Sequence, residues 1–163
     1  MWKKTLGIAM ILISMSVSAF AAIPRDQMHI GGLKLGMTLQ QVAAMYGTPV
    51  ADTSGTKASG GYYYIANGLI GGWIDGRTNA FIRYALHNEK PEAKRITGTG
   101  GLALGMTLME VENCLGVPDS VEPYGMKNLI MYNSVETRSD GGHDALLVFF
   151  HNGRVRSFTI NVF

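Results

Sequence analysis

Histidine, cysteine and glycine are the residue types with which this chain could hold a metal ion, a nucleophile or a phosphate group. None of the four histidines has the H-x-x-x-H spacing of a helical metal site, and the single cysteine, Cys114, leaves no C-x-x-C site and no intrachain disulfide. Cys114 falls on the apolar side of a predicted helix, where we expect it to be buried. The glycine-rich segment 98–101 lacks the Lys-Ser/Thr pair of a phosphate-binding loop and is interpreted as a linker. We therefore predict no catalytic residue, no metal and no cofactor.

Aromatic side chains support a different chemistry, the recognition of another protein. Tyr62, Tyr63 and Tyr64 are consecutive in a predicted strand, so that Tyr62 and Tyr64 share one face of the sheet. Rigid, amphipathic rings of this kind are favoured as anchors at protein interfaces. The candidate partner-binding residues are Tyr62, Tyr64, Trp73, Tyr84, Tyr132 and Phe150.

The elements that would position these side chains begin with a segment that occurs twice. "GGLKLGMTLQQVAAMYGTPV" (31–50) and "GGLALGMTLMEVENCLGVPD" (100–119) are identical at 11 of 20 positions, with a constant offset of 69. Thr38 and Thr107 are predicted helix N-caps, and Gln41 and Glu110 complete a capping box in each copy. Apolar residues at helical spacing, then a glycine and a proline, predict one helix of about eight or nine residues per copy. The residues of this structural motif are Gly36, Met37, Thr38, Gly47, Pro49, Gly105, Met106, Thr107, Gly116 and Pro118.

Strand patterns follow each predicted helix. We expect strands at 62–66, 69–74, 80–86 and 94–97 in the first half, and at 129–137, 145–151 and 154–163 in the second. The composition, 47% hydrophobic and 16% charged, is typical of a folded globular chain. The predicted fold is therefore α+β, with two tandem repeats, 22–98 and 99–163, each a short helix packed on an antiparallel β-meander.

The last hairpin allows a prediction of register. If Asn152-Gly153 is a two-residue turn, His151 faces Arg154. The more apolar face of the hairpin, which we expect to receive the helix, then carries Ala145, Leu147, Phe149, Phe158, Ile160 and Val162.

The first 21 residues have the pattern of a secretory signal peptide. Lys3 and Lys4 precede an apolar run at 6–17, and small residues at 18–21 predict cleavage after Ala21. The run is shorter than the ~20 residues of a spanning helix, and no lipid-attachment cysteine follows, so we expect a periplasmic or secreted protein with no transmembrane segment after cleavage. Loss of the two lysines brings the formal net charge from +2 to zero, which disfavours nucleic acid as a partner.

The repeated segments resemble a known domain. "LKLGMTLQQVAAMYGTP" and "LALGMTLMEVENCLGVPDS" resemble the G-M-T-x-x-[EQ]-V-x-x-x-x-G-x-P signature of the SmpA/OmlA (BamE-like) domain, and "VFFHNGRVRSFTI" resembles its closing hairpin. A unit of this kind present twice is similar to the β-lactamase inhibitory protein (BLIP-like) superfamily. The resemblance covers nearly all of residues 31–163. It implies a non-enzymatic protein–protein interaction module of the cell envelope, although the chain lacks the lipid-attachment cysteine of the first family and the paired cysteines of the second.

These observations leave three functions open. We expect an exported module that binds a protein partner in the envelope or the extracellular space through its sheet surface, for outer-membrane assembly or for inhibition of an enzyme. The alternative is a periplasmic protein that binds a small ligand or a cell-wall fragment. An enzyme would have to use His87, His143 or His151 with a nearby carboxylate. No oligomeric state is predicted.

Overall fold

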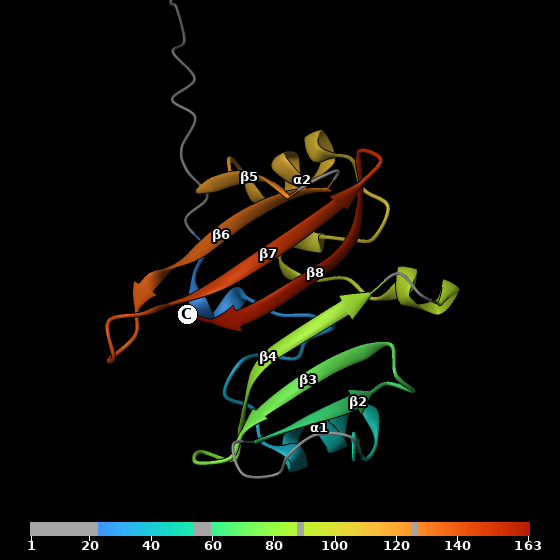
Figure 1. The fold of residues 1–163 in the computed structure, drawn as a ribbon, viewed down its shortest axis with the longest axis vertical. Coiled ribbons are helices and arrows are strands. Elements are labelled where there is room, and N and C mark those ends of the chain that lie inside the picture. Colours follow the sequence, from blue (N-terminus) through green and yellow to red (C-terminus); the bar gives the residue numbers. More distant parts are fainter. Residues whose placement is uncertain (1–22, 54–59, 88–89, 125–126) are drawn as a thin grey trace, which may run out of the picture.

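The chain folds as an α+β protein, seen in a computed structural model that describes residues 23–53, 60–87, 90–124 and 127–163. These residues form one eight-stranded antiparallel sheet and two short α-helices (Figure 1). The predicted signal peptide, 1–21, lies outside the described residues.

The strand order of the sheet is β1-β2-β3-β4-β8-β7-β6-β5, so that two four-stranded meanders meet where β4 pairs with β8. The helices are α1 (Leu39–Tyr46) and α2 (Leu108–Leu115). The strands are β1 (Val50–Ala51), β2 (Gly60–Ile65), β3 (Ile70–Asp75), β4 (Ala80–His87), β5 (Ser120–Tyr124), β6 (Lys127–Thr137), β7 (His143–His151) and β8 (Arg154–Val162). Short 3-10 turns occur at η1 (Arg25–Gln27), η3 (Pro91–Arg95) and η4 (Thr99–Gly101).

Two details of the strand prediction were wrong. The strand expected at 94–97 is absent, because Pro91 starts the 3-10 turn η3 and the chain leaves the sheet there. The edge strands β1 and β5 were not predicted. β1 is only two residues long, too short to show an alternating pattern. β5 contains Pro123, which argues against a strand in the sequence but is tolerated in a strand at the edge of a sheet.

Both capping boxes form as predicted, and they explain why such short helices begin where they do. Thr38 accepts a hydrogen bond from the backbone N–H of Gln41, and the Gln41 side chain accepts one from the backbone N–H of Thr38 at 2.8 Å. Thr107 and Glu110 repeat the arrangement in α2, with the return bond at 2.7 Å. Each helix ends at a glycine with positive φ, +79° at Gly47 and +85° at Gly116.

The G-M-T sequence joins each helix to a strand. Gly36 and Gly105 both have φ +89°, and their N–H groups donate to the carbonyl oxygens of Phe81 and Val155, in both cases at 2.8 Å. The following methionine carbonyl accepts a bond back from the same strand residue in each half. The G-M-T motif therefore holds the start of each helix against the start of β4 or β8 through two backbone hydrogen bonds.

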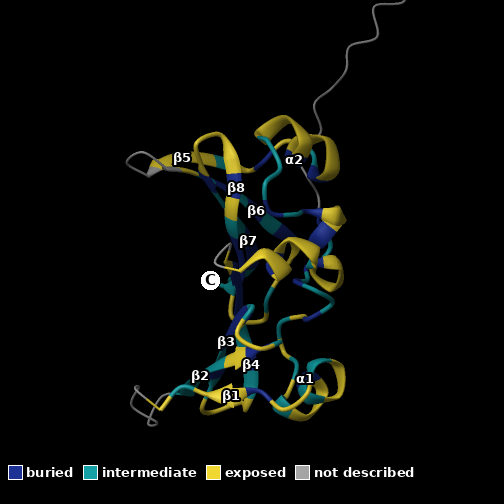
Figure 2. Cartoon of the chain, turned by 90° about the vertical axis from the view of Figure 1, so that its right-hand side faces the viewer, coloured by how far each residue is buried: buried dark blue, intermediate teal, exposed yellow. Residues whose placement is uncertain are grey.

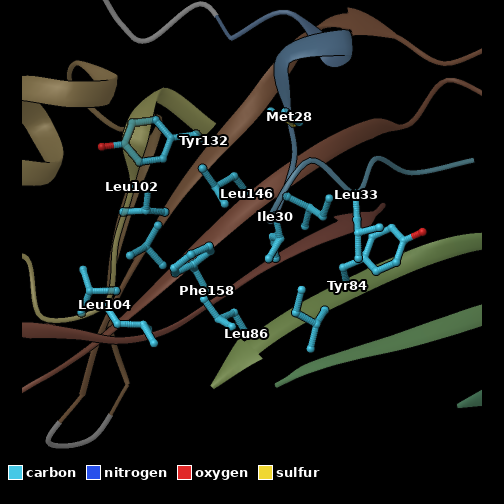
Figure 3. Close-up of a cluster of buried hydrophobic side chains, with 14 of the residues drawn as sticks. Met28, Ile30, Leu33, Tyr84, Leu86, Leu102, Leu104, Tyr132, Leu146 and Phe158 are labelled. Carbon is cyan, nitrogen blue, oxygen red and sulfur yellow. The ribbon is translucent and has the colours of Figure 1, made fainter. Parts of the chain in front are cut away.

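Both helices lie on the same side of the sheet (Figure 2). Between them and the sheet, buried side chains of both meanders form one hydrophobic cluster. Figure 3 shows Phe158 near the centre of this cluster, with Tyr132 and Tyr84 toward its two ends. Cys114 is exposed, which corrects the expectation that it is buried. A helix of two turns packs only a narrow stripe on the core, and in α2 that stripe is Val111 and Leu115.

A β-bulge overturns the predicted faces of the last hairpin. His151 faces Arg154 as predicted, but Phe149 pairs with Ser157 while Phe150 pairs with Val155, so that Arg156 is an extra residue. The extra residue shifts the following part of β8 by one position, which moves its side chains to the other face. The core face of this hairpin consequently carries Leu146, Val148, Phe150, Val155, Phe158 and Ile160.

Candidate functional site

The candidate site is the face of the sheet opposite the helices, here called the helix-free face. Side chains alternate between the two faces of a strand, so residues flanking a buried one point to the helix-free face. The paired positions form rows across the sheet. One row runs through Tyr62, Trp73, Arg83 and Asn161, from β2, β3, β4 and β8. The neighbouring row runs through Tyr64, Gly71, Ala85, Thr159, Leu147 and Met131.

Three of the predicted aromatic residues meet on this face. Tyr62 and Tyr64 have ring centroids 5.3 Å apart in an edge-to-face arrangement, and Tyr62 is paired across the strands with Trp73. Tyr64 is 43% exposed, and its hydroxyl donates to the Asp52 carboxylate at 3.4 Å. A Cβ atom at Gly71 would lie 1.8 Å from the Tyr62 hydroxyl oxygen. Glycine at position 71 is therefore what lets Tyr62 lie across β3.

The aromatic side chains border two depressions that share Tyr62 and His87. The larger one, of about 520 Å³, is called here the aromatic groove, and it is lined by Tyr62, Trp73, Ile82, Arg83, Ala85, His87 and Asn161. The smaller one, of about 270 Å³, is lined by Tyr62, Tyr64, Gly68, Leu69, Gly71, His87 and Lys90. Among the described residues that line them, neither depression has an aspartate or a glutamate, and the ionisable side chains are those of Tyr62, Tyr64, Arg83, His87 and Lys90.

The other three predicted partner-binding residues belong to the core, and this part of the prediction was wrong. Tyr84 and Tyr132 have no exposed surface and Phe150 is 3% exposed. Tyr84 stacks on Phe81 with ring centroids 4.9 Å apart, and the Tyr132 hydroxyl donates to the Gly116 carbonyl at 3.1 Å. Burial raises the pKa of both tyrosines above the ordinary value, and for Tyr132 the carboxylates of Glu112 and Asp119 add to the shift.

Several residues of the helix-free face were missed by the sequence reasoning. Arg83 and Asn161 come from different halves of the chain and meet only because β4 pairs with β8. In the second half, the same face carries Leu129, Met131, Leu147 and Phe149, which are partly exposed. Regular alternation along the hairpin would have paired Trp73 with Ile82, and only the bulge at Ile82 brings Arg83 opposite Trp73. No local signal pointed to Asn161.

The described residues show no cluster of three or more His, Cys, Asp and Glu side chains that could hold a metal ion. His87 lines the aromatic groove, whereas the ring of His143 lies 3.2 Å from the Ser134 carbonyl oxygen on another part of the sheet. Within the same described ranges, none of the helices has the length and apolarity needed to cross a membrane.

The fold and the site thus define an α+β protein with a single antiparallel sheet, two helices on one face and an aromatic groove on the other. Comparison with protein-family models, with curated proteins and with solved structures found no match.

Proposed function

We propose that the chain is an exported, non-enzymatic protein–protein interaction module that binds a protein partner through its helix-free face. The observation that carries this proposal is the aromatic set of exposed Tyr64 and half-buried Tyr62 and Trp73, on a sheet face that no helix of the described chain covers. Tyrosine and tryptophan on a rigid strand lose little entropy on binding and are enriched among the residues that dominate interface energies.

The dimensions of the helix-free face fit a protein partner. Eight strands at about 4.8 Å spacing span roughly 34 Å, and strands of six residues are about 20 Å long. The product is about 700 Å², close to the roughly 800 Å² that each partner contributes to a standard interface. A partner of ordinary size can therefore cover the face without any rearrangement of the sheet.

We also propose that the two halves are tandem repeats of one unit. The β4–β8 register supports this. Arg83 lies opposite Asn161 and His87 lies opposite Ser157. If each residue of β4 is equivalent to the residue of β8 that is 74 positions later, these two pairs are equivalent to each other and the pair Ala85↔Thr159 is equivalent to itself. That pattern is what a two-fold rotation through the Ala85–Thr159 pair produces.

Other features repeat with the same correspondence. The bulge residue Ile82 of β4 corresponds to Arg156 of β8. Phe81, whose backbone is hydrogen-bonded to the first G-M-T segment, corresponds to Val155, which is bonded to the second. On the helix-free face, Tyr62, Tyr64 and Trp73 of the first half correspond to Leu129, Met131 and Phe149 of the second. The face accordingly differs between its halves, with tyrosines and tryptophan in the first and leucine, methionine and phenylalanine in the second, which suits one extended partner better than two identical ones.

The resemblance to the SmpA/OmlA (BamE-like) domain supports an envelope location. It agrees with the predicted signal peptide at 1–21, and it favours a partner that is either an envelope assembly protein or an enzyme to be inhibited. The duplicated unit, similar to that of the BLIP-like superfamily, favours binding through the sheet.

A crosslinking capture experiment tests the proposal. The bait is the chain from Ala22, and the prey is an envelope extract of the source organism. We expect one captured protein, and we expect the Trp73→Ala/Tyr64→Ala variant to lose it while its thermal unfolding midpoint stays close to that of the parent. The matched control is Met45→Ala/Met109→Ala, which removes two exposed apolar side chains from the helices. Equal capture by the parent and the Trp73/Tyr64 variant would remove the helix-free face from consideration.

The second candidate function, binding of a small ligand or a cell-wall fragment, is favoured by the size of the aromatic groove. Its volume of about 520 Å³ lies within the range of small-molecule sites, roughly 300–1,000 Å³. A thermal-shift screen with cell-wall fragments distinguishes the two functions, because a ligand that binds the native state raises the unfolding midpoint with concentration.

A further inference from the structure

The aromatic groove carries the positive charge of Arg83, which no carboxylate of the described chain pairs with. Arg83 lines the groove and is exposed, and Lys90 lines the adjoining depression. The ion pairs of the described residues join Arg25 to Asp144 and Arg138 to Asp140 and Asp144, so Arg83 has no carboxylate partner among them.

The acidic groups nearest in the strand pattern are held elsewhere. Asp75 ends β3, and its carboxylate accepts hydrogen bonds from the hydroxyl and the backbone N–H of Thr78 in the following turn, at 2.9 and 3.2 Å. These bonds lower the pKa of Asp75 below its ordinary value, the Thr78 hydroxyl contributing most. The Asp52 carboxylate accepts a hydrogen bond from the Tyr64 hydroxyl at 3.4 Å. None of these carboxylates lines the groove.

The surroundings of Arg83 suit a carboxylate. Arg83 is paired across the strands with Trp73 on one side and with Asn161 on the other, and all three side chains line the same groove. A guanidinium group binds a carboxylate with two parallel hydrogen bonds, and a neighbouring side-chain amide can donate a third. The rings of Trp73 and Tyr62 supply an apolar wall that excludes water and strengthens such a pair.

The combination of an arginine paired with a tryptophan occurs only in the first of the two halves described. At the position that corresponds to Arg83, the second half has Ser157, and beside it Phe149 takes the place of Trp73. Arg156, at the position that corresponds to Ile82, is exposed but lies beside Phe149 and Ser157 instead of a tryptophan and an asparagine. The setting of Arg83 between Trp73 and Asn161 is therefore found in the first half and not at the equivalent place in the second.

We infer that the aromatic groove binds an acidic segment of the protein partner: an aspartate or glutamate side chain of an exposed loop, next to an apolar residue. The carboxylate is held by Arg83 and Asn161, and the apolar neighbour packs on Trp73 and Tyr62. This inference rests on the proposed function and adds to it the chemistry of the partner.

Tryptophan fluorescence tests the inference directly. The sequence has two tryptophans, Trp2 and Trp73, so the chain from Ala22 has Trp73 as its single fluorophore of this kind, and that residue lines the groove. The probes are three capped pentapeptides, acetyl-Gly-Phe-Asp-Leu-Gly-amide and its counterparts with Asn or Lys in place of Asp. We expect a saturable change of Trp73 emission with the Asp peptide, an affinity about tenfold weaker for the Asn peptide, and no binding of the Lys peptide.

The variant Arg83→Gln should reduce the affinity for the Asp peptide to that for the Asn peptide. The matched control Arg95→Gln removes the same charge from η3, outside the groove, and should leave the affinity unchanged. Equal affinity for the Asp and Asn peptides, an unchanged affinity in Arg83→Gln, or no saturable signal up to about 5 mM Asp peptide would overturn the inference.

Failure of the inference and failure of the proposed function give different results. If a protein is captured by the parent chain, lost in the Trp73/Tyr64 variant and retained by Arg83→Gln, the interaction module stands and the acidic segment does not. If no protein is captured through the helix-free face, the proposed function itself fails.

Discussion

The buried carboxylate of Asp144 should be one of the most sensitive single positions in the chain. Its side chain is 1% exposed, its Oδ2 atom accepts a hydrogen bond from Arg25 Nε, and its Oδ1 atom accepts one from Arg138 Nη1 at 3.3 Å. The Arg25–Asp144 pair ties the segment around η1 to β7. A backbone hydrogen bond from the Val135 N–H to the Ile23 carbonyl, at 3.0 Å, ties the same segment to β6. We therefore predict that Asp144→Ala lowers stability and releases the segment around η1.

The size of the effect follows from the exposure of the two arginines. Removing one member of a fully buried ion pair costs about 3–5 kcal/mol, much of it from the unpaired charge that is left behind. Here the side chains left behind are 45% and 23% exposed, for Arg25 and Arg138, so water can solvate them and the cost should lie near the lower limit, about 3 kcal/mol. For a chain of this length, that corresponds to a fall of roughly 6–12 °C in the unfolding midpoint.

Thermal unfolding followed by circular dichroism measures the change, and hydrogen exchange at residues 23–28 and at Val135 reports release of the segment. Asp140→Ala is the matched control, because Asp140 pairs with the same Arg138 at 3.1 Å but is 58% exposed. It should change the midpoint far less. A fall of less than about 2 °C in Asp144→Ala, or an equal fall in Asp140→Ala, would show that burial of this carboxylate does not control stability.

Two further predictions concern single hydroxyl groups. The Tyr84 hydroxyl is buried with no hydrogen-bond partner within the described residues, so Tyr84→Phe should stabilise the chain by about 1 kcal/mol in denaturant titrations, and a loss of stability would reveal a bonded hydroxyl. Thr38→Ala and Thr107→Ala should each cost about 1 kcal/mol at pH 7. Hydrogen bonds from the Thr107 N–H and hydroxyl lower the pKa of Glu110 below its ordinary value of 4.5. The stability that these two hydrogen bonds contribute is therefore fully present above pH 4.5, and it is lost as the pH falls through the lower pKa of Glu110 in the folded state. Gln41 does not titrate, so at pH 3 the cost of Thr107→Ala should shrink and that of Thr38→Ala should not. Equal pH dependence of the two variants in denaturant titrations would contradict this reasoning.

The sequence by itself determined the features that depend on neighbours in the chain. Both helices, their capping boxes at Thr38 and Thr107 and their glycine ends were predictable, because each rests on residues within one or two turns. The start of the last hairpin, with His151 facing Arg154, was predictable from Asn152-Gly153 for the same reason. Tyr62 and Tyr64 were likewise placed on a common face by the two-residue period of strands and are found there, whereas the pairing of Tyr62 with Trp73 was seen only in the structure.

Only the tertiary structure decided which residues beyond the first hairpin share that face. A single extra residue, Ile82 in β4 and Arg156 in β8, shifts the side-chain alternation by one, and no pattern in the sequence marked either bulge. Phe150 therefore lies in the core instead of facing a partner. Arg83 lies opposite Asn161 because β4 pairs with β8, and these strands are about 75 residues apart in the sequence. Pairing between strands so far apart is set by how the two halves pack together, which the residues near either strand do not reveal.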